Sequence, residues 1–139
     1  MEKVLKIIRL GNASSKPAAV CLLNSYVNEE HERRVGELLR EAGNWTVSLS
    51  FEILPEIREY ERTSATVINA YVQPIMRSYL RRLRDGLKAE GYGGELYLMN
   101  SLGGTMAVEM AEAFPIQMIE SGPTAGTLIA TLVGSQVKS

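Results

Sequence analysis

The chain has 139 residues, of which 45% are hydrophobic and 22% charged, and its 15 lysines and arginines nearly balance 16 aspartates and glutamates. This composition is typical of a soluble protein with one hydrophobic core, and the net charge of −1 argues against a nucleic-acid or membrane-surface partner. The single cysteine, Cys21, excludes a disulfide framework, and no apolar run approaches the roughly 20 residues of a bilayer span, so we expect a cytoplasmic protein.

The first third of the chain has the pattern of a β-α-β unit. Residues 1–10 predict a short amphipathic helix, and the apolar run 18–23 predicts a buried strand. A helix is expected to start after Asn28, which can cap it, and to stop at Gly43. Its expected inward side chains are Val35, Leu38, Leu39 and Ala42. Alternating apolar residues over 45–51 then predict a half-buried strand, so the two strands should be parallel.

The chain is organised around a long amphipathic helix from about Ser64 to Glu90. Apolar residues recur there in steps of three and four, which is the helical period. Thr63 or Ser64 can cap the start, and Gly91 can take the left-handed conformation that closes the end. Pro74 removes one backbone N–H inside this segment, which predicts a kink unless the helix is two pieces.

Beyond this helix the pattern predicts a second α/β segment. Residues 95–100 are expected to form a strand, Thr105 to cap a short helix that ends before Pro115, and residues 116–120 to form another strand. A small, buried apolar helix should follow, with Pro123 at its first position. The chain is therefore predicted to be α/β, with a mainly parallel sheet, flanking helices and one long central helix.

Two glycine-rich junctions are candidate binding sites. At 121–126, Gly122 lets a ligand approach the backbone, and the start of the following helix leaves N–H groups that attract anions. The alternative is a helix start without a ligand. The turn at 100–105 lacks the spacing of a dinucleotide site and the lysine of a P-loop, so its alternative is a tight turn with an N-cap.

A charged run at 56–62 has residue types that hold substrates through carboxylates and guanidinium groups. The alternative, which composition favours, is a solvated helix entry whose charges pair with one another. His31 has no neighbouring ligand in the sequence, so no metal site is predicted. Cys21 has no nearby base, so no catalytic residue is assigned.

Four segments resemble the hydantoinase and 5-oxoprolinase family, and they occur in the family's order. The longest, at 50–76, reads SFEILPEIREYERTSATVINAYVQPIM and carries the family's Arg-Glu-Tyr-Glu-Arg-Thr and Asn-Ala-Tyr words. The others read AVCLLNSYVNEEHERRVGELL at 19–39, LYLMNSLGGTM at 96–106 and ESGPTAG at 120–126. Together they cover most of the chain.

This resemblance implies part of an actin-like ATPase fold, with residues 1–55 as the end of an amino-terminal lobe and 56–139 as the truncated start of the hydantoinase A domain. The family opens cyclic amides such as 5-oxoproline and hydantoins by phosphoryl transfer with ATP and Mg²⁺, and relatives carboxylate ketones. It implies nucleotide- or anion-binding candidates at Ser121, Gly122, Gly126, Gly103 and Gly104. It implies substrate-side candidates at Arg58, Glu59, Glu61, Arg62, Asn100 and Ser101.

The sequence also departs from the family pattern. Leu102 stands where the family usually has Asn, and Thr124 where it usually has Ala. The two Asp-Gly-Gly-Thr-type motifs that would hold Mg²⁺ are absent, and the one aspartate, Asp85, lies within the long helix. The chain therefore resembles an internal segment of such an enzyme, inactive alone and dependent on the remainder of the enzyme or on companion subunits.

Two alternatives to this interpretation stay open. The first is a non-catalytic binding or oligomerisation module, and the second is one subunit of a split hydantoinase or ketone carboxylase-like enzyme. If part of the cover of the last helix is missing, its exposed apolar surface predicts self-association into a homo-oligomer.

Overall fold

The computed structural model describes residues 16–137, so the helix predicted for residues 1–10 lies outside the described part. The chain divides into two compact units, residues 1–77 and 78–139, each with its own secondary structure. Within the described residues, no helix is both long and apolar enough to cross a bilayer.

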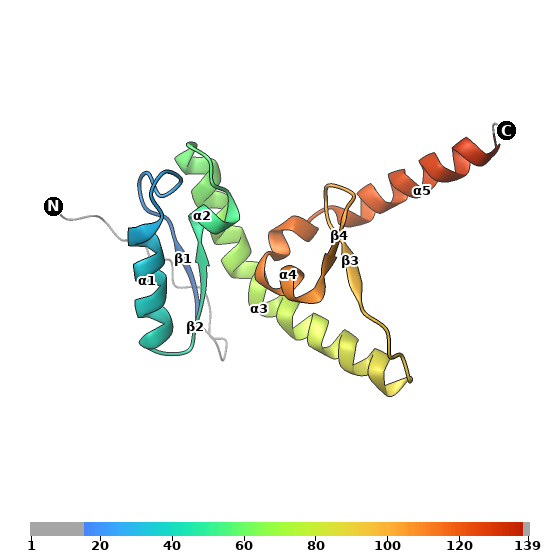
Figure 1. Cartoon of the computed structure of the whole chain (residues 1–139), viewed down its shortest axis with the longest axis horizontal. Helices are drawn as coiled ribbons and strands as arrows, with labels where there is room; N and C mark the ends of the chain where they lie inside the picture. The colour runs from blue at the N-terminus through green and yellow to red at the C-terminus, as the bar shows by residue number, and fades with distance from the viewer. Residues whose placement is uncertain (1–15, 138–139) are drawn as a thin grey trace. The chain divides into compact units, whose positions relative to one another are not determined.

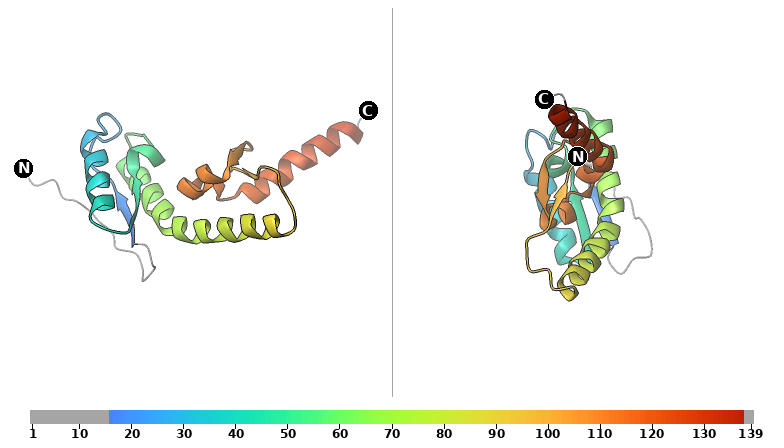
Figure 2. Two further views of the ribbon diagram at one scale, coloured as in Figure 1. Left: turned by 60° about the horizontal axis from the view of Figure 1, so that its bottom comes forward. Right: turned by 90° about the vertical axis from the view of Figure 1, so that its right-hand side faces the viewer.

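The first unit is built on a parallel pair of strands (Figure 1). β1 (Lys16–Val20) and β2 (Trp45–Leu49) pair in parallel with Ala18 opposite Val47, and α1 (Glu30–Glu41) connects them. This confirms the predicted β-α-β unit and its parallel pairing. In Figure 2, α1 lies on one face of the strand pair and the first half of α3 (Glu59–Ala89) on the other.

The second strand differs from its prediction, because both of its faces are buried. Val47 and Leu49 join the apolar core. The alternating polar residues Thr46 and Ser48 face inward as well, and Ser48 Oγ accepts a hydrogen bond from Asn69 Nδ2 of α3 at 3.0 Å. The chain then turns into a short helix, α2 (Ser50–Ile53), instead of continuing as a strand. The predicted strand is therefore confirmed over Trp45–Leu49, but its half-buried character and its extension to residue 51 are wrong.

Helix α1 starts and stops where the sequence predicts. Asn28 Oδ1 accepts the N–H of Glu30 at 3.0 Å, and the helix ends just before Gly43. Val35 and Leu39 pack on the core as expected. Leu38 and Ala42 are exposed, however, because the buried stripe of the helix runs through Glu32 and Gly36 instead.

Glu32 is fully buried and joins three segments of the first unit. Its Oε1 accepts the backbone N–H of Ser50 at 3.0 Å, and its Oε2 accepts the Ser50 hydroxyl at 3.1 Å. Ser50 Oγ in turn lies 3.1 Å from Ser25 Oγ in the loop after β1. A buried carboxylate is costly unless it accepts such hydrogen bonds, so this contact fixes α1, α2 and the loop together.

The long helix α3 begins at Glu59 and runs through Pro74 as one element. Thr63 and Ser64 lie inside it, so neither is the predicted cap. Its other end is as predicted: Gly91 has φ +84°, and Tyr92 N–H and Gly91 N–H donate to the carbonyls of Leu87 and Lys88 at 2.9 and 3.1 Å. This pair of hydrogen bonds is the Schellman motif that ends many helices.

The second unit contains an antiparallel hairpin instead of further parallel strands. β3 (Tyr97–Met99) pairs with β4 (Thr105–Ala107), with Leu98 opposite Met106. Thr105 therefore lies in a strand and does not cap α4 (Val108–Ala113), which starts three residues later. The mainly parallel sheet holds for the first unit alone, because the turn at 100–104 is short enough to reverse the chain directly.

The segment before the last helix is a 3₁₀ turn, η1 (Pro115–Met118), and not the strand predicted over 116–120. Pro115 occupies its start, where a missing N–H costs nothing. Helix α5 (Ser121–Val137) then begins two residues before Pro123. It has no buried residue within the described part of the chain, so the expectation of a buried helix is wrong.

We predict that Glu32→Ala lowers the free energy of unfolding of the first unit by about 2–4 kcal/mol, because it leaves the Ser50 N–H and hydroxyl without their acceptors. Urea unfolding followed by the fluorescence of Trp45, the only tryptophan, measures this. Glu41→Ala on the same helix is the matched control, since Glu41 is exposed. Equal midpoints for the two variants would contradict the proposed role of the Glu32 contact.

Candidate functional site

The structure brings the two glycine-rich segments of the second unit side by side. Thr124, in the first turn of α5, donates its hydroxyl to the carbonyl oxygen of Ser101 at 3.0 Å. Gly103 has φ +88° and packs against α5, where an added Cβ would lie 3.1 Å from Leu128 Cδ1. The turn and the helix start, which the sequence offers as separate candidates, therefore form one structural site.

Asn100 organises the turn from within. Its Oδ1 accepts the backbone N–H groups of Leu102 and Gly104, each at 3.0 Å. Asn100 N–H donates to Gly104 O at 2.8 Å, Gly103 N–H to Asn100 O at 3.2 Å, and Ser101 N–H to the carbonyl of Gln117 at 2.7 Å. Every backbone N–H from residue 100 to 104 thus has an acceptor inside the protein. The turn therefore supports α5 but has no backbone N–H left to donate to a ligand.

The free donors of this site lie at the start of α5. The first helical hydrogen bond of α5 is donated by the N–H of Thr124 to the carbonyl oxygen of Glu120, four residues earlier, at 3.3 Å. The N–H groups of Ser121 and Gly122 precede any acceptor of the helix, as in every helix start. Gly122 is exposed, and an added Cβ there would meet no atom within 4 Å. Such a start, with the positive end of the helix dipole, suits a phosphate or carboxylate.

The remaining predicted residues occupy different environments. Gly126 is exposed one turn further along α5, with open space where its Cβ would be. Leu102, at the tip of the turn, is 93% exposed. The substrate-side candidates are divided between the two units: Asn100 and Ser101 belong to the second, and the charged run belongs to the first.

The charged run does not behave as one group. Arg58, Glu59 and Glu61 are exposed at the start of α3, whereas Arg62 is fully buried. Among the described residues no ion pair joins members of this run, so the expectation that its charges pair with one another is wrong. What the three exposed residues bind stays a prediction.

Arg62 is held by backbone carbonyl groups. Its Nη1 donates to Glu56 O and its Nη2 to Leu22 O, both at 2.9 Å, and its guanidinium lies 5.3 Å from the centre of the Tyr26 ring. Its Nε is buried without a hydrogen-bond partner in the described structure. Arg62 therefore ties the segment before α3 to the loop after β1.

Sequence reasoning missed the partners that hold the site. The carbonyl of Gln117 accepts a hydrogen bond from the turn, and the side chain of Leu128 packs against Gly103. Neither residue belongs to a sequence pattern that would have predicted its contact. Thr124 did carry a signal, since it departs from the Ala usual in the resembling family. Its hydroxyl, which Ala lacks, makes the contact between the turn and the helix.

Residues 62–139 match the family model described as hydantoinase/oxoprolinase, and this span includes most of α3, the turn and α5. The chain belongs to this family. An uncharacterized protein of Methanocaldococcus jannaschii is 40% identical over 92% of the chain, and the chain covers 19% of that protein. The chain thus spans about a fifth or less of the curated relatives it matches.

Two solved structures show how the hydantoinase/oxoprolinase segment folds in larger proteins. A nucleotide-free structure of acetone carboxylase, from work on ATP-dependent acetone carboxylation, is similar with a TM-score of 0.70 and 27% identity over 85% of this chain. The ATP-dependent caprolactamase from Pseudomonas jessenii is similar with a TM-score of 0.62 and 32% identity over 79% of this chain. The chain covers 17% of each of those chains, so it corresponds to one α/β portion of them.

We predict that Thr124→Val destabilises the second unit by about 1–2 kcal/mol, because the carbonyl of Ser101 loses its side-chain donor. Amide hydrogen exchange of β3 and β4 measures this. Thr127→Val is the matched control: Thr127 donates to Pro123 O within the exposed helix at 3.0 Å and does not touch the turn. It should change the exchange free energy by less than about 0.5 kcal/mol, and equal losses in both variants would contradict the bracing role of Thr124.

We also predict that Arg62→Met lowers the free energy of unfolding of the first unit by about 2–4 kcal/mol, because the buried carbonyl contact at Leu22 and the part-buried one at Glu56 lose their charged donor. Arg58→Met, at an exposed position one turn earlier, should change it by less than about 0.5 kcal/mol. Trp45 fluorescence in urea reports both variants. If Arg62→Met left the free energy of unfolding unchanged, the two carbonyls would have found other donors, and Arg62 would be available to bind a ligand.

Proposed function

We propose that this chain supplies a phosphate-binding helix start to an ATP-dependent enzyme that opens cyclic amides. The observation that carries this proposal is the contact of Thr124 with Ser101, which fixes the start of α5, with the partly buried Ser121 and the exposed Gly122, on the hydrogen-bonded turn. Phosphoryl transfer depends mainly on positioning and on neutralising charge. A preorganised helix start provides both for one phosphate group.

The comparisons support the nucleotide. Both similar structures carry ATP-dependent reactions in their names, and the family name joins hydantoinase with oxoprolinase. We infer that the whole enzyme has an actin-like ATPase fold, as the sequence resemblance implies, and that it works in the cytoplasm. ATP would supply the phosphoryl group that activates the amide oxygen, while Ser121 and Gly122 would orient a phosphate through their N–H groups.

No Mg²⁺ site is assigned among the residues that the structure describes. Among them, no three His, Cys, Asp or Glu side chains lie together. We propose that other segments or companion subunits contribute the carboxylates that would hold Mg²⁺ against the phosphates of ATP.

A second candidate is a subunit role in a split enzyme or ketone carboxylase-like assembly. It is favoured by the similarity to acetone carboxylase and by α5, which buries no residue within the described structure and leaves Leu132 and Val133 more than half exposed. An apolar helix in water is stabilised by a covering partner, either a companion subunit or a second copy. This candidate differs from the first in the reaction, and both use the same phosphate-binding helix start.

The test is release of phosphate from ATP and Mg²⁺ by the purified chain, with and without 5-oxoproline or hydantoin. We expect no substrate-stimulated release from the chain alone and restored release when the remaining segments of the Methanocaldococcus relative are added. Stimulation by acetone and bicarbonate instead of a cyclic amide would favour the carboxylase candidate. Substrate-stimulated turnover by the chain alone would show that these residues suffice.

In the restored enzyme, Gly122→Leu should raise the KM for ATP at least about tenfold, because its side chain would block the approach of a phosphate to the helix start. Gly134→Leu is the matched control, since Gly134 lies on the same helix with open space where its Cβ would be. An unchanged KM in Gly122→Leu would contradict the assignment of the helix start.

A further inference from the structure

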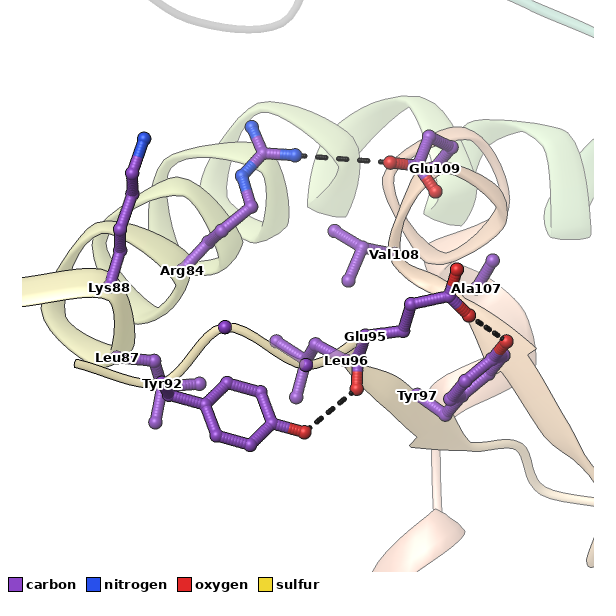
Figure 3. A pocket seen from close by; sticks show the side chains of 12 residues that line it. Arg84, Leu87, Lys88, Tyr92, Glu95, Leu96, Tyr97, Ala107, Val108 and Glu109 are labelled. Atoms are coloured by element: carbon purple, nitrogen blue, oxygen red, sulfur yellow. Dashed lines mark hydrogen bonds and ion pairs between the residues drawn. The ribbon is translucent and has the colours of Figure 1, made fainter. Parts of the chain in front are cut away.

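The second unit contains a pocket that uses none of the residues of the turn or of α5. It has a volume of about 580 Å³ and lies among the last turns of α3, the loop at 92–96 and the junction of β4 with α4 (Figure 3). This volume is within the range of small-molecule sites.

The loop wall of the pocket is fixed by one aromatic ring. The Tyr92 hydroxyl donates to the carbonyl of Glu95 at 3.0 Å. The ring lies so close to Gly94 that an added Cβ there would be 2.7 Å from the Tyr92 oxygen. Glycine at this position is therefore what allows the ring to close the loop.

Two cations lie on the helix wall. Arg84 and Lys88 are four residues apart on α3, a spacing that puts both side chains on one face. The carbonyls of Leu87 and Lys88 at the helix end already accept backbone N–H groups, so neither cation is needed to cap the helix. Within residues 16–137, no carboxylate forms an ion pair with Lys88.

Two carboxylates also line the pocket, Glu95 from the loop and Glu109 from α4. Glu109 Oε1 lies 3.8 Å from Arg84 Nη1, which is an ion-pair distance but too long for a hydrogen bond. Glu95 accepts the hydroxyl of Tyr97, and this contact raises the pKa of Tyr97 so that the phenol stays neutral beside the carboxylate. Figure 3 shows the side chains of Arg84 and Glu109 pointing toward each other.

Apolar side chains line the pocket as well. They are Leu87, Leu96 and Val108. A ligand that satisfies this site needs an anionic group for Arg84 and Lys88, a cationic group for Glu95 and Glu109, and a short hydrocarbon body between them. Such a ligand replaces the 3.8 Å contact between Arg84 and Glu109 with one contact to each of its two charged ends. A simple anion would leave the two carboxylates facing it, and a simple amine would face the two cations.

We propose that this pocket binds a small zwitterion, in which a carboxylate and an ammonium group are separated by a short apolar chain. The carboxylate accepts hydrogen bonds from the Arg84 guanidinium, whose planar fork matches a carboxylate, and from Lys88. The ammonium donates to Glu109 and Glu95. Binding here does not depend on the activity proposed above, since it requires neither ATP nor another chain.

The probe is 5-aminopentanoate, titrated into the full chain without nucleotide and followed by amide chemical shifts or calorimetry. Because the charged groups are largely solvated, we expect a millimolar Kd. Pentanoate and pentylammonium, which each carry one of the two charges, should bind at least about fivefold more weakly. Pentanoate binding as tightly as 5-aminopentanoate would overturn the zwitterion assignment, and so would the lack of saturation by about 50 mM probe.

Variants locate the site. Arg84→Met together with Lys88→Met keeps the aliphatic stems and removes both cations, and it should weaken 5-aminopentanoate binding at least about tenfold. Arg82→Met is the matched control, because Arg82 is exposed on the same helix and does not line the pocket. Circular dichroism checks that both variants fold. Unchanged binding in the double variant, or an equal loss in Arg82→Met, would overturn the proposal.

Discussion

The first unit depends on the satisfaction of two buried charges that have no oppositely charged partner among the described residues. Glu32 and Arg62 are both fully buried, and each is stabilised by neutral groups: hydroxyl and N–H donors for the carboxylate, and backbone carbonyls for the guanidinium. A buried charge is tolerated only when its hydrogen bonds are made. These contacts therefore fix the loop after β1, which supplies Leu22, and the segment after β2, which supplies Ser50 and Glu56.

The need to satisfy polar groups also shapes the second unit, where the N–H groups of the turn have acceptors and those at the start of α5 do not. Asn100 satisfies the N–H groups of its turn, and the turn becomes a rigid support. The start of α5 has no such residue, so its first N–H groups are left for solvent or for a ligand. The glycines at the two places consequently differ in purpose. Gly103 provides a left-handed backbone and close contact with Leu128, whereas Gly122 keeps the helix start open.

Local patterns in the sequence predicted the β-α-β unit, its parallel pairing and the closure of α3 at Gly91. These features depend on periodicity and on glycine, both of which act over a few residues. The sequence failed where a distant partner decides the outcome. The alternating pattern predicts that Ser48 faces solvent, but Asn69 of α3 donates a hydrogen bond to it. Thr105 is a different case, because the turn at 100–104 pairs it with the nearby Met99 where a helix cap is predicted. The closeness of the turn to α5 likewise depends on Thr124 and Ser101, which are 23 residues apart.

Helix α5 would link the proposed phosphate site to the proposed covering partner. Its first turn holds the donors, Leu128 packs against Gly103, and the turns beyond are apolar and exposed. The free energy that positions a helix start comes largely from packing along the helix. The contacts of Thr124 and Leu128 fix only its beginning, so a partner that covers Leu132 and Val133 would stiffen the whole element and hold the donors more precisely. In the proposed enzyme, assembly and phosphate binding would therefore be coupled through this single helix.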